Sequence, residues 1–237
     1  MTVVDFNIEM GLYIFKFDSF ETEFHSHPTI EIIIAEKGTF TLCTGNRTYD
    51  QLKFAIINAN QKHKLLATNC ELKLLMIEHH KSLVLDVFEQ NGIFLSDGFY
   101  CNAFNDDVNF IVDKIVQKVL NGELFLNYDN RIGLIISYLN KNDVEYHQML
   151  STLKTVTNLS ESRLSHLFKS NLGISLKRYL IWNKLKFTIK QHLHKQEDLF
   201  SCLINNGFYD QPHFGRNFKS MLGVNAAKVY NSRTIQV

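Results

Sequence analysis

Residues 160–173 read SESRLSHLFKSNLG and residues 210–223 read DQPHFGRNFKSMLG, so one pattern occurs twice, 50 residues apart. Each copy begins with a good N-capping residue, Ser160 or Asp210. An apolar residue and a phenylalanine four positions after it then lie on one helix face. Both copies end with glycine, which favours the left-handed backbone just after a helix. The repeat therefore predicts two capped helices of equal length.

A shorter helical stretch precedes each copy: MLSTLKTVT before the first and LFSCLINN before the second. Helix, tight turn, capped helix and glycine form a helix-turn-helix unit, predicted here at about 149–172 and 199–222. The second helix of such a unit enters the major groove of DNA, with its N-terminal residues against base edges. One copy would equally suit an ordinary amphipathic helix, but two copies favour DNA binding.

The predicted DNA-contacting residues are the polar side chains that remain outside the apolar face of each helix. Gln and Arg can form paired hydrogen bonds with adenine and guanine edges, and the lysines suit phosphate contacts. The first helix offers Ser162, Arg163, Ser165, His166 and Lys169, and the second offers Gln211, His213, Arg216, Asn217 and Lys219.

The charge of the chain is unevenly distributed, although its net charge is only +1. Residues 1–128 hold 10 Lys and Arg against 17 Asp and Glu, a net charge of −7, whereas residues 129–237 hold 15 against 7, a net charge of +8. The split predicts two domains, and a polyanion such as double-stranded DNA as the partner of the second. The alternative is that the basic half only docks on the acidic half.

Composition excludes several other classes of protein. The four cysteines are scattered without a CxxC pair, which is typical of free thiols in a reducing compartment. The N-terminal residues do not resemble a signal peptide, and no apolar run approaches the roughly 18 residues of a membrane span. We therefore expect a cytoplasmic protein with no membrane partner.

The first hundred residues are predicted to be β structure, because short apolar runs alternate with Gly, Asn and Asp. From about residue 105 the period changes to that of an amphipathic helix, with one stripe formed by Val108, Ile111, Val112, Ile115, Val116 and Val119. Beyond this stripe the segments are helical. Strands followed by helices indicate separate β and α domains.

Residues 130–233 resemble the AraC-type transcriptional regulators. LSESRLSHLFKSNLGISLKRYL is similar to the first helix-turn-helix of that family, GFYDQPHFGRNFKSMLGV to the second, and WNKLKFTIKQHLHKQ to the long helix between them. The resemblance implies two helices in successive major-groove segments, with base contacts from Ser162, Ser165, His166, Gln211, His213 and Arg216. Leu176 and Ala226 stand where family members usually have Pro.

The N-terminal half contains the spacing HxHx3Ex6G in His25, His27, Glu31 and Gly38, followed by His63. This pattern resembles the two motifs of cupins, β-barrels that often serve as sensor domains of AraC-type proteins. The resemblance implies a divalent cation held by His25, His27, Glu31 and His63, with Fe, Mn, Ni or Zn suited to such ligands. The alternative is that these side chains hold no metal and instead hydrogen-bond within the barrel or line an effector pocket. Asn58 and Asn60 depart from the second motif, which has Pro and Gly there.

The predicted architecture is an α+β multidomain protein, in which an all-β cupin-like barrel precedes an all-α domain with two helix-turn-helix motifs joined by a long helix. The domains are predicted at 1–104 (sensor), 105–128 (dimerisation helix and linker) and 129–237 (DNA binding). The stripe on the 106–120 helix has two interpretations: packing on the barrel, or a seam between two subunits, which we favour.

The predicted function is sequence-specific transcription regulation, controlled by an unknown small effector in the barrel. A homodimer is expected, and RNA polymerase would be a further partner of an activator. No cofactor is required for DNA binding. The alternatives are a metal-dependent cupin enzyme, such as a dioxygenase or isomerase, and a regulator whose barrel binds no effector.

Overall fold

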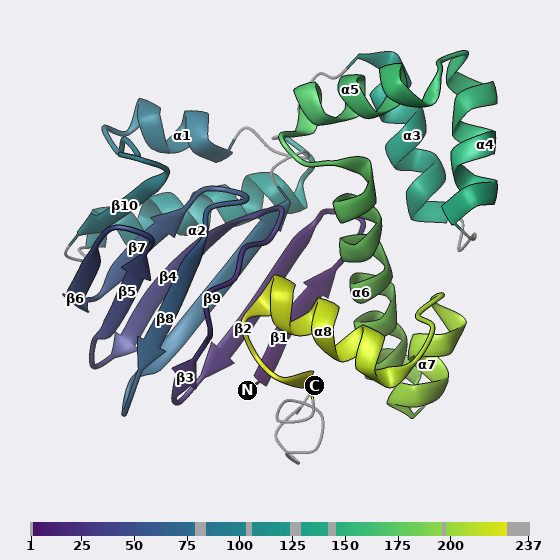
Figure 1. Cartoon of the computed structure of the whole chain (residues 1–237). Helices are drawn as coiled ribbons and strands as arrows, with labels where there is room; N and C mark the ends of the chain where they lie inside the picture. The colour runs from purple at the N-terminus through teal and green to yellow at the C-terminus, as the bar shows by residue number, and fades with distance from the viewer. Residues whose placement is uncertain are drawn as a thin grey trace. The chain divides into compact units, whose positions relative to one another are not determined.

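The computed structural model describes residues 2–78, 84–102, 106–123, 129–141, 146–195 and 198–226. The chain divides into two compact units, a first unit of residues 1–126 with 218–237 and a second unit of residues 127–217. The domain limits proposed above remain predictions, because this division passes through the last helix, α8 (Gln211–Leu222). Strands precede helices along the chain, as predicted (Figure 1).

The strands of the first unit form two antiparallel sheets. The six-stranded sheet has the order β1-β2-β9-β4-β7-β10, and the four-stranded sheet has the order β3-β8-β5-β6. The strands are β1 (Thr2–Asn7), β2 (Leu12–Phe17), β3 (Phe20–Glu21), β4 (Thr29–Lys37), β5 (Phe40–Thr44), β6 (Thr48–Leu52), β7 (Phe54–Ile57), β8 (His63–Ala67), β9 (Glu71–Glu78) and β10 (Phe99–Asn102).

The space between the two sheets is an apolar core. Successive side chains of a strand point to opposite faces of its sheet, so alternate residues enter this core. The larger sheet contributes Ile33, Ile57 and Leu74, and the smaller sheet contributes Leu42 and Leu65, all at most 4% exposed. The predicted β domain is therefore present as two sheets that share one core.

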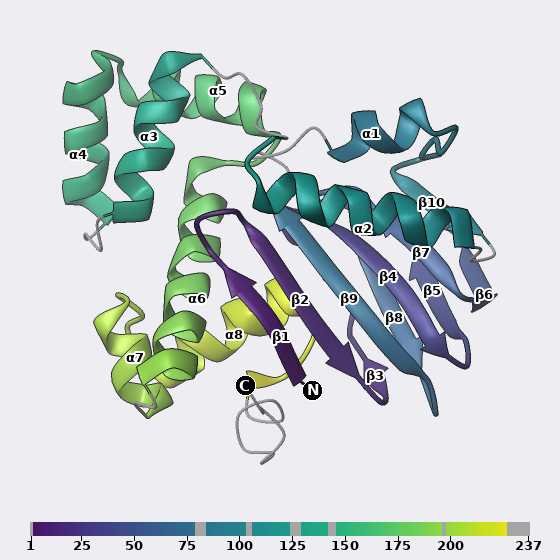
Figure 2. The ribbon, with the colours of Figure 1, turned by 180° about the vertical axis from the view of Figure 1, so that it is seen from behind.

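The outer face of the six-stranded sheet is covered by helices α1 (Val84–Gln90) and α2 (Asp106–Leu120) (Figure 2). Strands β4 and β7 are buried on both faces, because their outward-facing side chains pack against these helices. This explains why TIEIIIAEK has a continuous apolar run where a half-buried strand would alternate.

The apolar stripe of α2 packs on this sheet within the same chain. Its residues Val108, Val112, Ile115 and Val119 are between 0% and 6% exposed and belong to the same core as the strands. The stripe therefore packs on the β domain, which was the first of the two interpretations. The favoured interpretation, a seam between two subunits, was wrong for this stripe. A homodimer itself remains a prediction.

The second unit is helical, with α3 (Asn130–Lys141), α4 (Tyr146–Thr157), α5 (Glu161–Leu172), α6 (Leu176–Lys195) and α7 (Leu199–Asn205). Helices α3, α4 and α5 and the start of α6 share one core, in which Leu153, Leu164, Phe168 and Tyr179 are fully buried. The rings of Phe168 and Tyr179 meet edge to face, with centroids 5.3 Å apart. In the described part of the chain, no helix combines the length and apolar character needed to cross a membrane.

Candidate DNA-contacting helices and a buried histidine cluster

Helix α5 has the caps that the repeat predicts. The hydroxyl of Ser160 accepts a hydrogen bond from the backbone N–H of Arg163 at 3.4 Å. Gly173 adopts a φ of 66° and donates its N–H to the carbonyl of Lys169. Leu164, Phe168 and Leu172 are buried and Leu167 is half-buried, so α5 packs on the core through its leucines and phenylalanine. The first predicted helix is confirmed in position and in its buried face.

Helix α8 repeats these features 50 residues later. The carboxylate of Asp210 accepts a hydrogen bond from the N–H of His213 at 2.6 Å. Gly223 has a φ of 72° and donates to the carbonyl of Lys219 at 2.9 Å. Phe214 is fully buried, with its ring centroid 5.1 Å from that of Phe208. The two helices thus share their caps and their apolar anchors.

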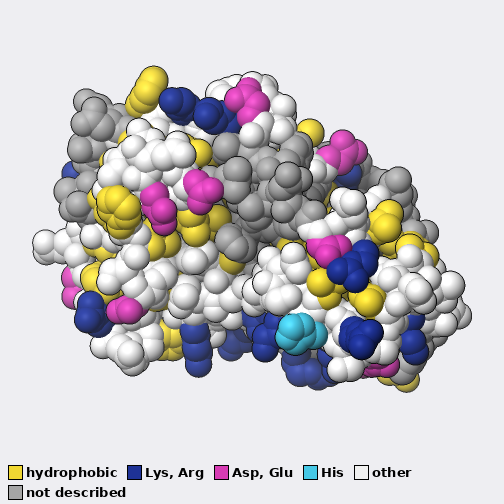
Figure 3. All heavy atoms as spheres, turned by 90° about the horizontal axis from the view of Figure 1, so that it is seen from above, with side chains coloured by type: hydrophobic (Ala, Val, Ile, Leu, Met, Phe, Trp, Pro, Cys, Tyr) yellow, Lys and Arg dark blue, Asp and Glu magenta, His cyan; other side chains and the backbone are white. Residues whose placement is uncertain are grey.

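The predicted DNA-contacting side chains of α5 are exposed. This group comprises Ser162, Arg163, Ser165, His166 and Lys169. Three of them line a shallow hollow of about 400 Å³ together with Arg131 from the start of α3. Sequence reasoning missed Arg131, because it lies about 30 residues before α5. On the face drawn in Figure 3, a histidine has Lys and Arg side chains on both sides.

Arg131 is already paired. Its guanidinium donates two hydrogen bonds to Asp129, at 2.9 and 2.6 Å, in the parallel arrangement that suits a carboxylate. These hydrogen bonds lower the pKa of Asp129 to about 2. Asp129 therefore stays ionised and neutralises the charge that Arg131 brings to the hollow.

The polar face of α8 is less uniform. Gln211, Arg216 and Lys219 are exposed, whereas His213 and Asn217 are half-buried. The amide of Asn217 donates to the carbonyl of His213 at 2.8 Å. Nδ1 of His213 accepts from the N–H of Tyr209 at 3.4 Å, which leaves the hydrogen of a neutral ring on Nε2. Gln211 and Arg216 are therefore the side chains of α8 that are freest to contact bases.

The four predicted side chains of the N-terminal motif come together in the first unit. His25 and His27 lie in the segment between β3 and β4, with their ring centroids 5.6 Å apart. His25 and His63 exchange two backbone hydrogen bonds, at 2.9 and 3.0 Å, which places their rings side by side with centroids 4.2 Å apart. Glu31 extends from β4 toward the rings. Potential ligand atoms of all four lie within 4.8 Å of one another, and all four residues are buried.

The outer nitrogen of each imidazole is held by the backbone. Nδ1 of His25 lies 2.9 Å from the carbonyl oxygen of Glu23. Nδ1 of His27 lies 3.1 Å from that of Thr29, and Nδ1 of His63 lies 3.0 Å from that of Gln61. A carbonyl only accepts, so in His25 and His63 these contacts favour the hydrogen on Nδ1 and a lone pair on Nε2, as is usual for metal-binding histidines. In His27 the hydroxyl of Thr29 lies closer to Nδ1, at 2.6 Å, and can donate to it, while Nε2 can donate to Glu31 at 3.1 Å.

The inner nitrogens meet the carboxylate of Glu31. Nε2 of His27 lies 3.1 Å and Nε2 of His63 lies 2.9 Å from Oε2. The second contact lacks hydrogen-bond geometry, so Nε2 of His63 is a buried polar atom without a hydrogen-bond partner. A ring with a single hydrogen on Nδ1 cannot also donate from Nε2, so Nε2 of His63 presents a lone pair toward Glu31. This nitrogen and the carboxylate fit a bound cation, whereas both nitrogens of His27 have partners in Thr29 and Glu31.

The pKa values indicate that Glu31 is ionised while His25 and His27 are neutral. Burial, followed by the neighbouring His63 and His27, lowers the pKa of His25 to about 3. Burial also lowers the pKa of His27, although Glu31 opposes this. Burial acts to raise the pKa of Glu31, but the contacts with His27 and His63 together lower it below its usual range. A carboxylate that stays ionised among neutral imidazoles is costly to bury without a cation.

Asn60, which stands where the predicted second motif has glycine, adopts a backbone conformation that glycine favours. It has a φ of 65°, the left-handed region that glycine favours and asparagine tolerates. Its N–H donates to the carbonyl of His27 at 2.7 Å. Gly38, the last residue of the first motif, also has a positive φ, and a Cβ there would lie 3.0 Å from the carbonyl oxygen of Asn69.

Comparisons with known proteins agree with the C-terminal motifs. Residues 153–231 match a family described as a helix-turn-helix domain. No curated protein matches the chain.

The solved structures that share this fold include ToxT from Vibrio cholerae. An apo variant of ToxT from strain SCE256 is 12% identical with a TM-score of 0.56, and the match covers 94% of this chain and 98% of that one. ToxT from strain O395 gives 12% identity and a TM-score of 0.55, covering 94% and 97%. The O395 protein bound to (E)-4-(8-methylnaphthalen-1-yl)but-3-enoic acid gives 11% and 0.54, covering 92% and 97%. At this identity the likeness concerns the fold.

Proposed function

We propose that this chain, which carries an AraC-type helix-turn-helix domain behind a domain of two antiparallel sheets, regulates transcription by binding specific DNA sequences under the control of a small effector. The observation that carries the proposal is the duplicated helix. Both α5 and α8 have a side-chain N-cap, a buried phenylalanine and a glycine stop, and both expose polar residues in their first turns.

The two helices would contact successive major-groove segments. Arg216 and Gln211 of α8 can form paired hydrogen bonds with guanine and adenine, and His166 of α5 can donate to or accept from a base edge. Lys169 and Lys219 lie near the last turns of their helices, where they suit phosphate contacts.

Control by an effector requires that it bind one conformation of the protein better than another. The N-terminal unit is the proposed sensor, because it has an interior core between two sheets and a polar cluster that DNA binding does not use. The structure of ToxT bound to a substituted butenoic acid offers a precedent for a ligand in a protein of this fold.

Selection of binding sites from a random duplex library tests the proposal. A site with two half-elements about one helical turn apart is expected. Arg216→Ala should alter one half-element and His166→Ala the other. If the full-length protein enriches no sequence with or without a metabolite mixture, the proposed function is wrong.

A homodimer remains part of the proposal. Phe110 supports it, because this side chain of α2 faces away from the sheet and is 70% exposed. Sedimentation of the purified protein is expected to give twice the chain mass of 27.6 kDa. Phe110→Glu should reduce that mass by half, whereas Asp113→Asn on the same helix should not change it.

A second candidate function rests on the histidine cluster. We propose that His25, His27, Glu31 and His63 hold a divalent cation, because carbonyls fix Nδ1 of His25 and of His63, and Nε2 of His63 faces Glu31 without a hydrogen-bond partner. The cation could stabilise the sensor, or could act as a Lewis acid in a metal-dependent cupin enzyme.

Metal content after purification tests this site. About one Fe, Mn, Ni or Zn ion per chain is expected. His63→Ala should abolish it, and His166→Ala, which removes an exposed histidine of α5, should leave it unchanged. A metal content that is the same in both variants would exclude the cluster as the binding site.

A further inference from the structure

The first unit contains a pocket that neither the DNA contacts nor the histidine cluster uses. It measures about 400 Å³, and its lining includes Thr44, Arg47, Tyr49, Gln61, Asp97 and Phe99. None of the four cluster residues lines it. Its size is within the range of small-molecule sites.

Arg47 provides the positive charge that extends over this pocket. It ends the turn between β5 and β6, where the N–H of Thr44 donates to the carbonyl of Arg47 at 2.8 Å. The N–H of Arg47 in turn donates to the hydroxyl of Thr44 at 3.1 Å. The backbone that carries the guanidinium is thus fixed, while no carboxylate among the described residues forms an ion pair with it.

Asp97 provides the negative charge from a different turn. Asp97 and Gly98 have φ values of 52° and 84°, which are typical of a two-residue hairpin turn of type I′. Ser96 and Phe99 close the turn with two backbone hydrogen bonds, at 2.8 and 2.9 Å. A third bond, from the N–H of Asn58 to the carbonyl of Gly98, ties the turn to the sheet. Asp97 is also without an ion pair among the described residues.

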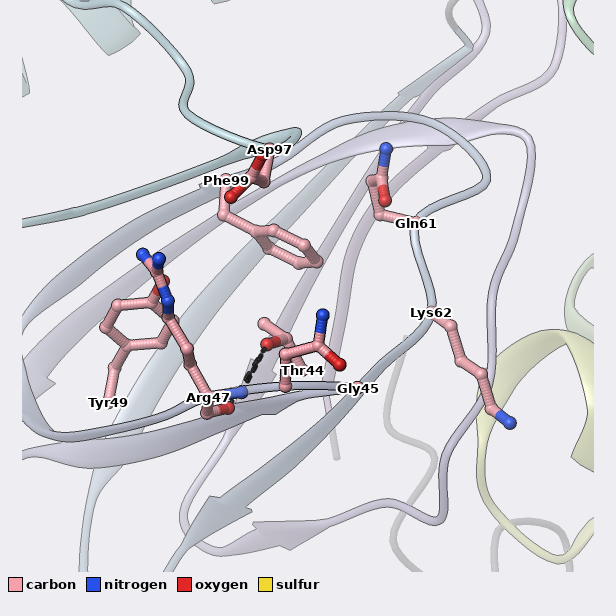
Figure 4. Close-up of a pocket in the computed structure, with 9 residues that line it drawn as sticks. Thr44, Gly45, Arg47, Tyr49, Gln61, Lys62, Asp97 and Phe99 are labelled. Carbon is pink, nitrogen blue, oxygen red and sulfur yellow. Dashed lines mark hydrogen bonds between the residues drawn. The ribbon is translucent and has the colours of Figure 1, made fainter.

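An aromatic ring lines the same pocket as the two charged side chains. Figure 4 shows the ring of Phe99 extending into the pocket, with Arg47 and Tyr49 on one side of it and Gln61 on the other. Phe99 pairs with Ile57, and Ile57 pairs with Glu31, on adjacent strands. The fully buried Ile57 therefore separates the pocket from the histidine cluster.

We propose that this pocket binds a small zwitterion of the amino-acid type. Arg47 would pair with the carboxylate, Asp97 with the ammonium group, and the rings of Phe99 and Tyr49 would contact the rest of the molecule. A ligand with only a negative charge would face Asp97, and one with only a positive charge would face Arg47, so the pocket selects against both. The inference rests on the proposed function, because it names the class of effector that the regulator would sense.

Isothermal titration of the full-length protein with each common amino acid in turn tests the proposal without DNA. At least one is expected to bind. The carboxamide and the N-acetyl form of the strongest binder, which each lack one charge, should bind at least about tenfold more weakly. Absence of binding by every amino acid, or equal binding by both derivatives, would overturn the proposal.

Three variants locate the site. Arg47→Gln and Asp97→Asn should each weaken binding at least about tenfold, and asparagine tolerates the positive φ of position 97. Lys53→Gln is the matched control, because this exposed lysine between β6 and β7 does not line the pocket. Unchanged binding in the first two variants would place the ligand elsewhere. If the selection enriches no DNA site, the proposed regulator function is wrong, but the binding of an amino acid measured by titration is unaffected.

Discussion

Oε2 of Glu31 lies 2.9 Å from Nε2 of His63, and neither side chain is more than 3% exposed. A buried carboxylate this close to an imidazole nitrogen requires a proton or a metal ion nearby to balance its charge. The stability of the first unit is therefore linked to protons when the cluster holds no metal.

Acid should destabilise the metal-free first unit. The pKa values of His25 and His27 are lowered by folding, so the unfolded chain binds protons below pH about 6.5 while the folded chain does not. Each histidine then costs about 1.4 kcal/mol of unfolding free energy per pH unit. Below pH about 4.5 the lowered pKa of Glu31 causes a further loss of unfolding free energy, because the unfolded chain then binds a proton that the folded chain does not.

Urea unfolding at pH 7.5 and pH 5 with a chelator, followed by circular dichroism, measures this effect. Fluorescence of the single tryptophan, Trp182, reports on the second unit and serves as the reference. His25→Gln should make the pH dependence less steep. A pH dependence as steep as that of the parent protein would contradict the assignment.

Base preference should respond to single substitutions in the two helices. Arg216→Ala and His166→Ala should each cost about 1–3 kcal/mol at one position of the selected site, because each removes one base contact. Lys169→Ala should instead weaken binding to all sequences alike, as expected of a phosphate contact. Competition binding with single-base variants of the site distinguishes the two patterns. Identical selected motifs for all three variants would show that α5 and α8 do not contact bases.

Asp129→Asn should strengthen DNA binding. The change removes a negative charge beside the hollow and releases Arg131 from its two hydrogen bonds, so Arg131 becomes free to contact phosphate. The slope of log K against log salt should steepen by about 1.

Asp113→Asn provides the matched control. It makes the same change of charge on α2 in the first unit. Equal slopes for the two variants would indicate that only net charge matters and that Arg131 is not near the DNA.

The cap of α8 should be measurable in stability. Asp210→Ala removes the acceptor of the 2.6 Å hydrogen bond from His213 and should cost about 1 kcal/mol. Asp210→Ser should restore most of the loss, because serine caps helices about as well. Urea unfolding followed by Trp182 fluorescence gives the comparison, and equal stability of the alanine and serine variants would contradict the capping role.

Local features of the fold could be predicted because they depend on nearby residues. The caps at Ser160 and Asp210 and the glycine stops depend on contacts within one helix, so their spacing in the sequence was sufficient.

Features that depend on distant segments could not be predicted. The periodicity of α2 shows an apolar stripe but not whether a sheet or a second subunit covers it. The ligand pocket is lined by two turns, around Arg47 and Asp97, which are 50 positions apart. No local sequence pattern predicts that these turns lie together. Arg131 could not be predicted as a neighbour of α5 because it also lies far from that helix in the sequence. The hydrogen on Nδ1 of His25 and of His63 depends on which carbonyl the fold brings to it.

The repeated helix also separates two tasks that proteins often combine in the same side chains. In α5 and α8 the residues that hold the helix in place (Leu164 and Phe168, Phe214 and Phe218) are buried, whereas Ser165, His166 and Arg216 are exposed. Exchanging the exposed residues of one helix leaves its buried residues unchanged and does not involve the other helix. The preferred DNA sequence of each half-site can therefore be changed separately, with libraries that vary only the codons of a few exposed residues in α5 or in α8.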